Sequence, residues 1–154
     1  MEIKSIRYRC TDEELEKYRN NLEALKSPDG MFPFLRDMGG RLDWIRGVQA
    51  QGTLAVSKKD GNRNPFGILS GGAIDTLCDI IGGYTALQPG VDSFTVCSNL
   101  NYLQPAEGEK VVCLATLLRL SHYRATVEMR VSDENDCLIA SGTFQYALVK
   151  TRRA

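Results

Sequence analysis

The sequence predicts a single α+β domain in which a strongly curved antiparallel sheet of five to six strands wraps around one long helix. Three observations lead to this fold. Residues 71–87 form one long apolar helical stretch, several strand patterns with short links follow it, and a helical pattern precedes both. We expect residues 1–30 to form an N-terminal helical extension and residues 31–154 to form the single domain.

The N-terminal extension carries a helix-start signal. Thr11 and Glu14 have the spacing of a capping box, in which each side chain bonds a backbone amide at the start of a helix. We expect a helix from Asp12 to about Lys26. Its apolar stripe must pack on the main body or on a partner chain; it consists of Leu15, Tyr18, Leu22 and Leu25.

The long helix is predicted over Gly71–Leu87, because this stretch contains no proline and is apolar around most of its circumference. A helix of that kind belongs inside a protein. Ser70 is a suitable N-cap, since its hydroxyl can accept a bond from a first-turn amide. Pro89-Gly90 ends the helix.

Strand patterns occupy the segments on either side of this helix. After a short helical turn at residues 32–35, residues 41–57 read as a strand interrupted by Gly47 and Gly52, which indicates a hairpin or a bulge. Four more strand patterns follow the helix, at residues 93–103, 110–120, 123–132 and 138–149. Their short links predict that consecutive strands are antiparallel neighbours. Residues 110–120 are apolar on both sides, as expected of a strand covered on both faces.

Composition excludes several classes of function. The 19 basic and 19 acidic residues balance, so we expect no nucleic-acid partner and no membrane surface. The N-terminus lacks a signal peptide and no apolar run could span a bilayer, so we expect a cytoplasmic protein. The five cysteines lack a C-x-x-C pattern and are expected to be reduced core residues. With His122 as the single histidine, we expect no metal site and no cofactor.

Gly71 and Asp79 are the first candidates for chemistry. The amide of Gly71 lies in the first helical turn, where backbone N–H groups lack intrahelical acceptors and can hold a developing oxyanion. Close packing is the alternative explanation of the Gly71-Gly72 pair. A carboxylate on a buried helix, as at Asp79, must be paired or used; a structural bond to the backbone or to Tyr84 is the alternative.

The distance between these two residues has a consequence for assembly. Asp79 follows Gly71 by eight residues, which corresponds to about 12 Å along a helix axis. One reacting group cannot touch both within one chain, so a shared site requires a two-fold dimer with antiparallel central helices. The Gly82-Gly83 pair would allow such helices to approach closely. Asp75, one turn before Asp79, either raises the pKa of its neighbour or only occupies the first turn.

The remaining candidates lie on strands and turns. His122 and Arg124, in a predicted turn, could meet a phosphate or pantetheine group, and a solvated turn is the alternative. The rings of Tyr123 and Tyr102 are expected in a core or an interface rather than as stacking platforms for a substrate.

Two segments carry a family resemblance: NPFGILSGGAIDTLCDIIGGYTAL and SFTVCSNLNYLQPAEGEKV. With the final hairpin, they resemble the hotdog-fold acyl-CoA thioesterases of the phenylacetate-degradation type, over about Phe32 to Val149. That family has the pattern N-x-x-G-x-x-H-G-G and an acid nine residues after the histidine. The matching positions here are Asn64, Gly67, Ser70, Gly71, Gly72 and Asp79. Ser70 therefore replaces the motif histidine, which in the family orients the asparagine and the thioester.

The resemblance implies a mechanism. Asn64 and the amide of Gly71 would polarise the thioester carbonyl, and Asp79 of the opposite subunit would act as general base or nucleophile. Thr95 matches a position that helps to hold the attacking water. Further substrate contacts are implied for Ser70, Gly72, His122, Tyr123 and Arg124. Coenzyme A would be part of the substrate, and the assembly a homodimer or a dimer of dimers.

Two further implications concern positions that depart from the family. Asp75 stands where the family usually has a small or apolar residue. The N-terminal helix precedes the strongest match and could shape the acyl pocket.

Other functions were weighed against thioester hydrolysis. Ser70 motivates a non-catalytic hotdog module that binds acyl-CoA without turnover. A hotdog hydratase would place a catalytic histidine near the central helix, whereas His122 lies in a distant turn. A purely structural dimer would leave the coincidence of Asn64, Gly71, Asp79 and Thr95 with functional positions unexplained.

Overall fold

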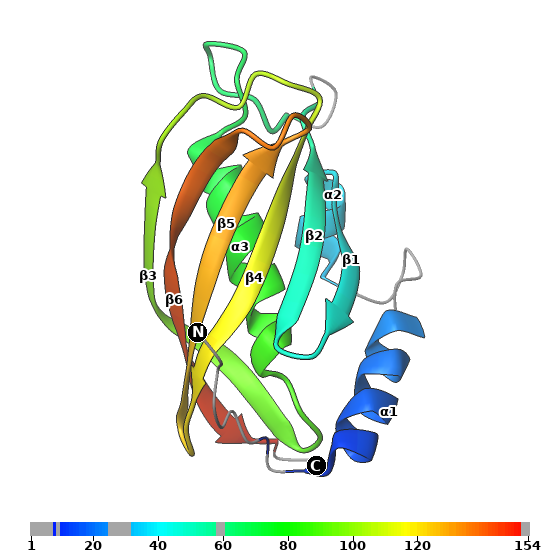
Figure 1. Cartoon of the computed structure of the whole chain (residues 1–154). Coiled ribbons are helices and arrows are strands. Elements are labelled where there is room, and N and C mark those ends of the chain that lie inside the picture. Colours follow the sequence, from blue (N-terminus) through cyan, green and yellow to red (C-terminus); the bar gives the residue numbers. More distant parts are fainter. Residues whose placement is uncertain (1–7, 9, 25–31, 58–60, 152–154) are drawn as a thin grey trace.

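A computed structural model of the chain describes residues 8, 10–24, 32–57 and 61–151 (Figure 1). Within these ranges the helices are α1 (Asp12–Ala24), α2 (Pro33–Asp37) and α3 (Gly71–Ala86). The strands are β1 (Gly40–Arg46), β2 (Gln49–Ala55), β3 (Val91–Tyr102), β4 (Lys110–Leu120), β5 (Arg124–Asp133) and β6 (Leu138–Lys150). The predicted elements are therefore present with small displacements of their ends. The predicted end of the first helix, residues 25–26, lies outside the described residues.

The strands form one antiparallel sheet of six strands over the described ranges, in the order β1-β2-β4-β5-β6-β3, and this sheet curves around α3 (Figure 1). The predicted α+β architecture is confirmed. The β1–β2 hairpin turns at Gly47, and its bulge lies between Leu42 and Trp44, opposite Gly52.

One neighbour relation in the sheet differs from the prediction. β3 does not pair with β4, which follows it in the sequence; it pairs with β6 at the far edge of the sheet. β2 occupies the position beside β4 instead. The segment of residues 103–109 is thus a connection that crosses the end of the sheet rather than a hairpin loop. It passes over the start of α3, where Leu69 N–H donates to the carbonyl of Ala106 at 3.0 Å.

The core lies between α3 and the concave face of the sheet. Leu77, Cys78 and Ile81 of α3 are fully buried, as are the inward-facing residues of β4 and β5. The opposite face of β4 is only half-buried, so the prediction that this strand is covered on both faces is wrong; α3 covers one face. Although α3 is strongly apolar, no helix in the described ranges is long and apolar enough to cross a lipid bilayer.

The cysteines only partly follow the prediction. Cys78 and Cys113 are buried free thiols with their Sγ atoms 3.8 Å apart. Cys97, by contrast, is exposed on β3, and so is not a core residue. The reason is the bulge between Thr95 and Cys97: Thr95 pairs with the buried Tyr146, whereas Cys97 pairs with Gln145 on the opposite face of the sheet.

The N-terminal helix α1 is fixed to the main body beside the β1–β2 turn (Figure 1). The predicted capping box is present, because Glu14 accepts from the Thr11 amide at 2.8 Å and donates its own amide to the Thr11 hydroxyl at 3.2 Å. Leu15 is buried, so this part of the stripe packs on the main body; the side chains of Leu22 and Leu25 lie outside the described residues.

Arg19 is the anchor of α1. It is 5% exposed, and its guanidinium donates to the carbonyl of Gly47 in the β1–β2 turn and to the carbonyl of Thr85, at 3.4 Å, in the last turn of α3. Tyr8 completes the cluster, since its hydroxyl accepts from Arg19 at 2.9 Å and donates to Thr85 at 3.0 Å. A cation at a helix C-terminus is favoured by the helix dipole.

Candidate active site

The loop before α3 is held in one conformation by Asn62, which is 5% exposed. Its side-chain amide donates to the carbonyls of Met38 at 2.9 Å and Ala55 at 2.7 Å, and its side-chain oxygen accepts from the amide of Ser57 at 3.1 Å. Its own carbonyl accepts from the amide of Ser70 at 2.8 Å. Sequence patterns indicated only a polar loop here, because the hydrogen-bond partners of Asn62 come from three other segments.

Asn64 is oriented by the same loop. Its side-chain oxygen accepts from the amides of Phe66 at 2.9 Å and Ile68 at 3.4 Å, an arrangement common for asparagine in turns. Its own amide donates to the carbonyl of Ile68 at 2.8 Å. The side-chain NH₂ group has no recorded acceptor among the described residues. The carboxamide is therefore held by its oxygen, with its donor side left for a ligand.

The start of α3 offers further donors. Ser70 is the N-cap, but its hydroxyl makes no capping hydrogen bond, so that part of the prediction is wrong. Its backbone carbonyl instead accepts from the amides of Ala73 at 3.0 Å and Ile74 at 3.2 Å. The amides of Gly71 and Gly72 have no recorded acceptor among the described residues, and the helix dipole favours negative charge beside them.

Tyr102, at the end of β3, covers Gly71. Its hydroxyl donates to the carbonyl of Gly71 at 2.9 Å, and a Cβ at position 71 would lie 3.3 Å from its ring. Burial raises the pKa of Tyr102, and the charge of Asp75 raises it further. The ring is 51% exposed, so it is not a core residue of this chain. Asn64, Gly71 and Tyr102 line one cavity of about 340 Å³.

Asp79 lies in a second cavity, of about 370 Å³. Its carboxylate accepts a hydrogen bond from the hydroxyl of Thr95 on β3. The buried hydroxyl of Tyr146 donates to the backbone carbonyl of Asp79 at 2.9 Å and fixes this turn of the helix. The other lining residues are mostly apolar or aromatic: Tyr18, Phe32, Ile80, Gly83, Tyr84, Leu87, Asp92, Ser93, Phe94, with Tyr146.

The predicted site residues thus assemble in separate groups within one chain. Asn64 and Gly71 share the first cavity, whereas Asp79 and Thr95 share the second. This separation agrees with the distance of about 12 Å expected along the helix.

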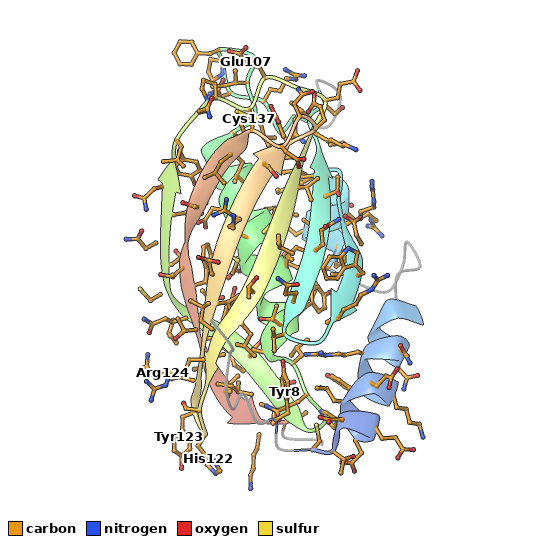
Figure 2. All side chains as sticks on the ribbon, in the orientation of Figure 1. Tyr8, Glu107, His122, Tyr123, Arg124 and Cys137 are labelled. Atoms are coloured by element: carbon orange, nitrogen blue, oxygen red, sulfur yellow. The ribbon has the colours of Figure 1, made fainter. Side chains whose placement is uncertain are left out.

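The third group, His122, Tyr123 and Arg124, lies in neither cavity. All three side chains are exposed in the turn between β4 and β5, at the end of the sheet opposite to Glu107 (Figure 2). The turn is tight, as predicted, because the amide of Ser121 donates to the carbonyl of Arg124 at 2.8 Å. The rings of His122 and Tyr123 meet edge to face at 5.3 Å, and Tyr123 is 72% exposed. Of the two positions expected for Tyr123, the core is therefore ruled out in this chain, and the interface stays a prediction.

One face of α3 is not buried by its own chain. The residues on this face are Gly71, Gly72, Asp75, Thr76, Asp79, Ile80 and Gly83. Gly82 is not among them: it is buried against Met129 and Tyr146 of the chain's own sheet, so only Gly83 can serve a close helix approach from outside. Burial, and then the charge of Asp79, raises the pKa of Asp75. No group of three or more acidic, histidine or cysteine side chains suited to a metal ion occurs in the described part of the chain.

Comparison with known proteins identifies this architecture. Residues 66–140 match the family model of the Thioesterase superfamily. The matched residues make up slightly less than half of the chain. The matched region spans α3 and β3 to β5 and contains Gly71, Asp79 and Thr95, while α1 lies before it.

Individual proteins are also similar to this chain. The chain is similar to a candidate esterase of Thermoplasma acidophilum, at 27% identity over 126 residues, or 79% of this chain and 94% of the relative. It shares the hotdog fold with the Escherichia coli PaaI protein of the phenylacetic acid degradation operon, at a TM-score of 0.76 and 14% identity, over 88% and 96% of the two chains. A Streptococcus mutans protein bound to acetyl CoA aligns at a TM-score of 0.66 and 24% identity, over 73% and 90%.

The packing of α3 predicts opposite effects for its two adjacent glycines. In Gly82→Ala the new Cβ would lie 2.0 Å from Met129 Cε and 2.3 Å from the Tyr146 hydroxyl, so we expect the free energy of unfolding to fall by about 1–2 kcal/mol. In Gly83→Ala the atom nearest to the new Cβ is 3.5 Å away. The better helix propensity of alanine should therefore raise the free energy of unfolding by about 0.5–1 kcal/mol. Urea denaturation at one protein concentration measures both. Equal stabilities for the two variants would contradict the assigned packing.

Proposed function

We propose that the protein is an acyl-CoA thioesterase, which hydrolyses an acyl- or aroyl-CoA thioester to the free acid and coenzyme A at a site built by two subunits. One observation carries the proposal. Asp79, whose carboxylate is paired with the hydroxyl of Thr95 on β3, lies on the same helix as the unpaired amide donors, but in a different cavity. The match to the Thioesterase superfamily and the similarity to an esterase support this chemistry.

The second subunit is required because one α3 cannot bring both groups to one carbonyl carbon. If two α3 helices run antiparallel, the partner subunit's Asp79 comes opposite Gly71, and a two-fold axis makes two equal sites. The unburied face of α3 supports this arrangement.

The edge of β3 supports it as well. Three of its large apolar side chains, Phe94, Val96 and Tyr102, are about half exposed, and so is the adjoining Leu103. In the described part of the chain, the outer edge of β3 has unpaired backbone N–H and C=O groups along most of its length, and long edges of this kind are usually paired or covered. A second copy of the chain would place β3 against β3. Pairing of two such dimers into a tetramer remains a further proposal.

Hydrolysis follows from the groups so assembled. The thioester carbonyl oxygen accepts from the NH₂ group of Asn64 and the amide of Gly71. The partner subunit's Asp79 removes a proton from a water molecule as the water oxygen attacks the carbonyl carbon, and Thr95 holds the carboxylate in position. The oxyanion that forms is stabilised by the two donors and by the dipole of α3. Collapse of this intermediate breaks the C–S bond and releases the acid and the thiolate of coenzyme A.

The coenzyme A portion would lie at the outer rim of the site. Ser70 and Gly72 lie beside Gly71 at the start of α3, with Gly72 exposed. In an antiparallel dimer the β4–β5 turn of one subunit comes toward the helix start of the other. His122, Tyr123 and Arg124 of that turn are therefore proposed to contact the phosphates of coenzyme A, for which Arg124 supplies the charge.

The acyl group would enter the cavity beside Asp79. Its wall includes Tyr18 of α1 and the edge-to-face pair Phe32–Tyr84, whose ring centroids lie 5.8 Å apart. The N-terminal helix thus contributes Tyr18 to this cavity, which supports the expectation that it shapes the acyl pocket. Aromatic walls in a cavity of this size suit a ring or a chain of limited length.

Ser70 favours a second candidate function. Without the imidazole of the motif histidine, the protein could bind acyl-CoA and not turn it over. The two functions differ in one measurable respect, which is product formation that depends on Asp79.

Two near-isosteric variants test the catalytic assignment on a panel of acyl- and aroyl-CoA substrates. Asp79→Asn removes the base, and Asn64→Asp keeps the oxygen that holds the loop but removes the NH₂ donor. We expect each to lower kcat by about 10²–10³-fold with the fold retained. Free coenzyme A is measured with a thiol reagent, and Asp136→Asn in the exposed β5–β6 loop is the matched control.

Two outcomes would contradict the proposal. The enzyme assignment fails if the wild type hydrolyses no member of the panel under conditions where a known thioesterase does. The protein would instead be a binding module if it binds acyl-CoA saturably and if Asp79→Asn does not change the rate of product formation.

The acyl cavity predicts a change in selectivity. Phe32→Ala enlarges the cavity, so the ratio of kcat/KM for a longer acyl-CoA to that for a shorter one should rise by about tenfold. Phe34→Ala removes a neighbouring ring that is 65% exposed and does not line the cavity, and should leave the ratio unchanged. Equal ratios in both variants would place the acyl group elsewhere.

A further inference from the structure

Asp75 lies midway along α3 between Gly71 and Asp79, the two parts of the proposed site that α3 carries. It lies four residues after Gly71 and four before Asp79, so the three residues share one face of α3. This is the face that the chain leaves unburied. Asp75 lines neither of the two cavities, so the proposed hydrolysis does not use it.

Symmetry determines what Asp75 meets in the dimer. For two antiparallel helices related by a two-fold axis, the residue numbers that face each other have a constant sum. If Gly71 faces the partner subunit's Asp79, this sum is 71 + 79 = 150, and position 75 faces itself. Asp75 and the partner subunit's Asp75 then lie on the axis, on the face where the helices approach.

We propose that the two Asp75 carboxyl groups meet on the two-fold axis and share a proton, so that dimer formation takes up protons and weakens as the pH rises. This inference rests on the proposed two-subunit site. Two carboxylates forced together in a partly buried place cannot both remain charged without a large cost, whereas one protonated carboxyl donates a hydrogen bond to the other.

The surroundings of Asp75 offer no compensating positive charge. The groups coupled to its carboxylate are Asp79 on the same helix, Tyr102 on β3 and Tyr146 on β6. Cys78 is also coupled to it and lies against Cys113 of β4. No lysine, arginine or histidine is among these groups in the described part of the chain. The two-fold axis adds a second set of the same acidic and neutral groups.

The sign of the effect follows from proton linkage. In the single chain, burial and the charge of Asp79 already raise the pKa of Asp75, and a facing carboxylate with further burial raises that pKa again. A group with a higher pKa in the dimer than in the free subunit binds more protons in the dimer. Association is therefore strongest below the pKa of the free subunit, and weakens as the pH passes through the pKa of the dimer.

The test compares the dimer dissociation constant of the full chain with that of Asp75→Asn, by sedimentation equilibrium between about pH 5 and about pH 8. For the wild type we expect the constant to rise by about tenfold or more over this range. Asparagine imitates the protonated acid, so Asp75→Asn should dimerise more tightly than the wild type at the upper pH and vary little with pH. Asp136→Asn, which removes an exposed carboxylate, should retain the dependence of the wild type.

Subunit exchange between dimers with different fluorescent labels gives a second readout where the dimer is too tight to dissociate. The inference would be overturned if the dimer dissociation constant and the exchange rate do not change with pH. It would also be overturned if they change equally in wild type and Asp75→Asn. If thioester hydrolysis and a dimer persist in that case, the proposed function stands. If the chain remains monomeric at every pH and still hydrolyses thioesters, the two-subunit site itself is wrong.

Discussion

The rigid spacing of Gly71 and Asp79 on one helix is the constraint on which the rest of the structure depends. A rise of about 1.5 Å per residue keeps the amide donors and the carboxylate apart, and no side-chain rotation can close that gap. Asn64 and Gly71 accordingly line one cavity and Asp79 another, and in the proposed dimer these would be the two halves of one site. The same constraint gives a reason for an unburied face on an otherwise buried helix and for the apolar edge of β3. Assembly and chemistry then depend on the same surface.

Local sequence patterns predicted the helices and strands. The features that they did not predict depend on contacts between residues far apart in the sequence. The apolar helix, the alternation of β5 and the tight β4–β5 turn all depend on residues that are close together in the sequence. The edge position of β3 is not, because it depends on β2 taking the place beside β4. Gly82 and Gly83 look alike in sequence, but only the first packs on Met129 and Tyr146. Asn62 and Tyr102 were missed as parts of the site for the same reason: their partners are distant in the chain.

In the proposed enzyme, the N-terminal helix would affect both stability and substrate selectivity. Arg19 ties α1 to the β1–β2 turn and to the end of α3, and Tyr18, its neighbour, forms part of the wall beside Asp79. This segment precedes residues 66–140, the region that matches the family model. Asp75 adds a second individual feature, a charge in the centre of the proposed interface. The common part of the fold would thus supply the reaction, and these two features its substrate range and its response to pH.

Subunit mixing tests the two-subunit site most directly. Asp79→Asn and Asn64→Asp are co-expressed with different affinity tags, and the heterodimer is purified and assayed. One of its two sites combines an intact Asn64 with an intact Asp79 of the partner subunit, while the other site carries both defects. The heterodimer should regain about half of the wild-type activity, although each parent homodimer is nearly inactive. No recovery in a stable heterodimer would show that Asp79 and Asn64 act within one chain, and would contradict the composite site.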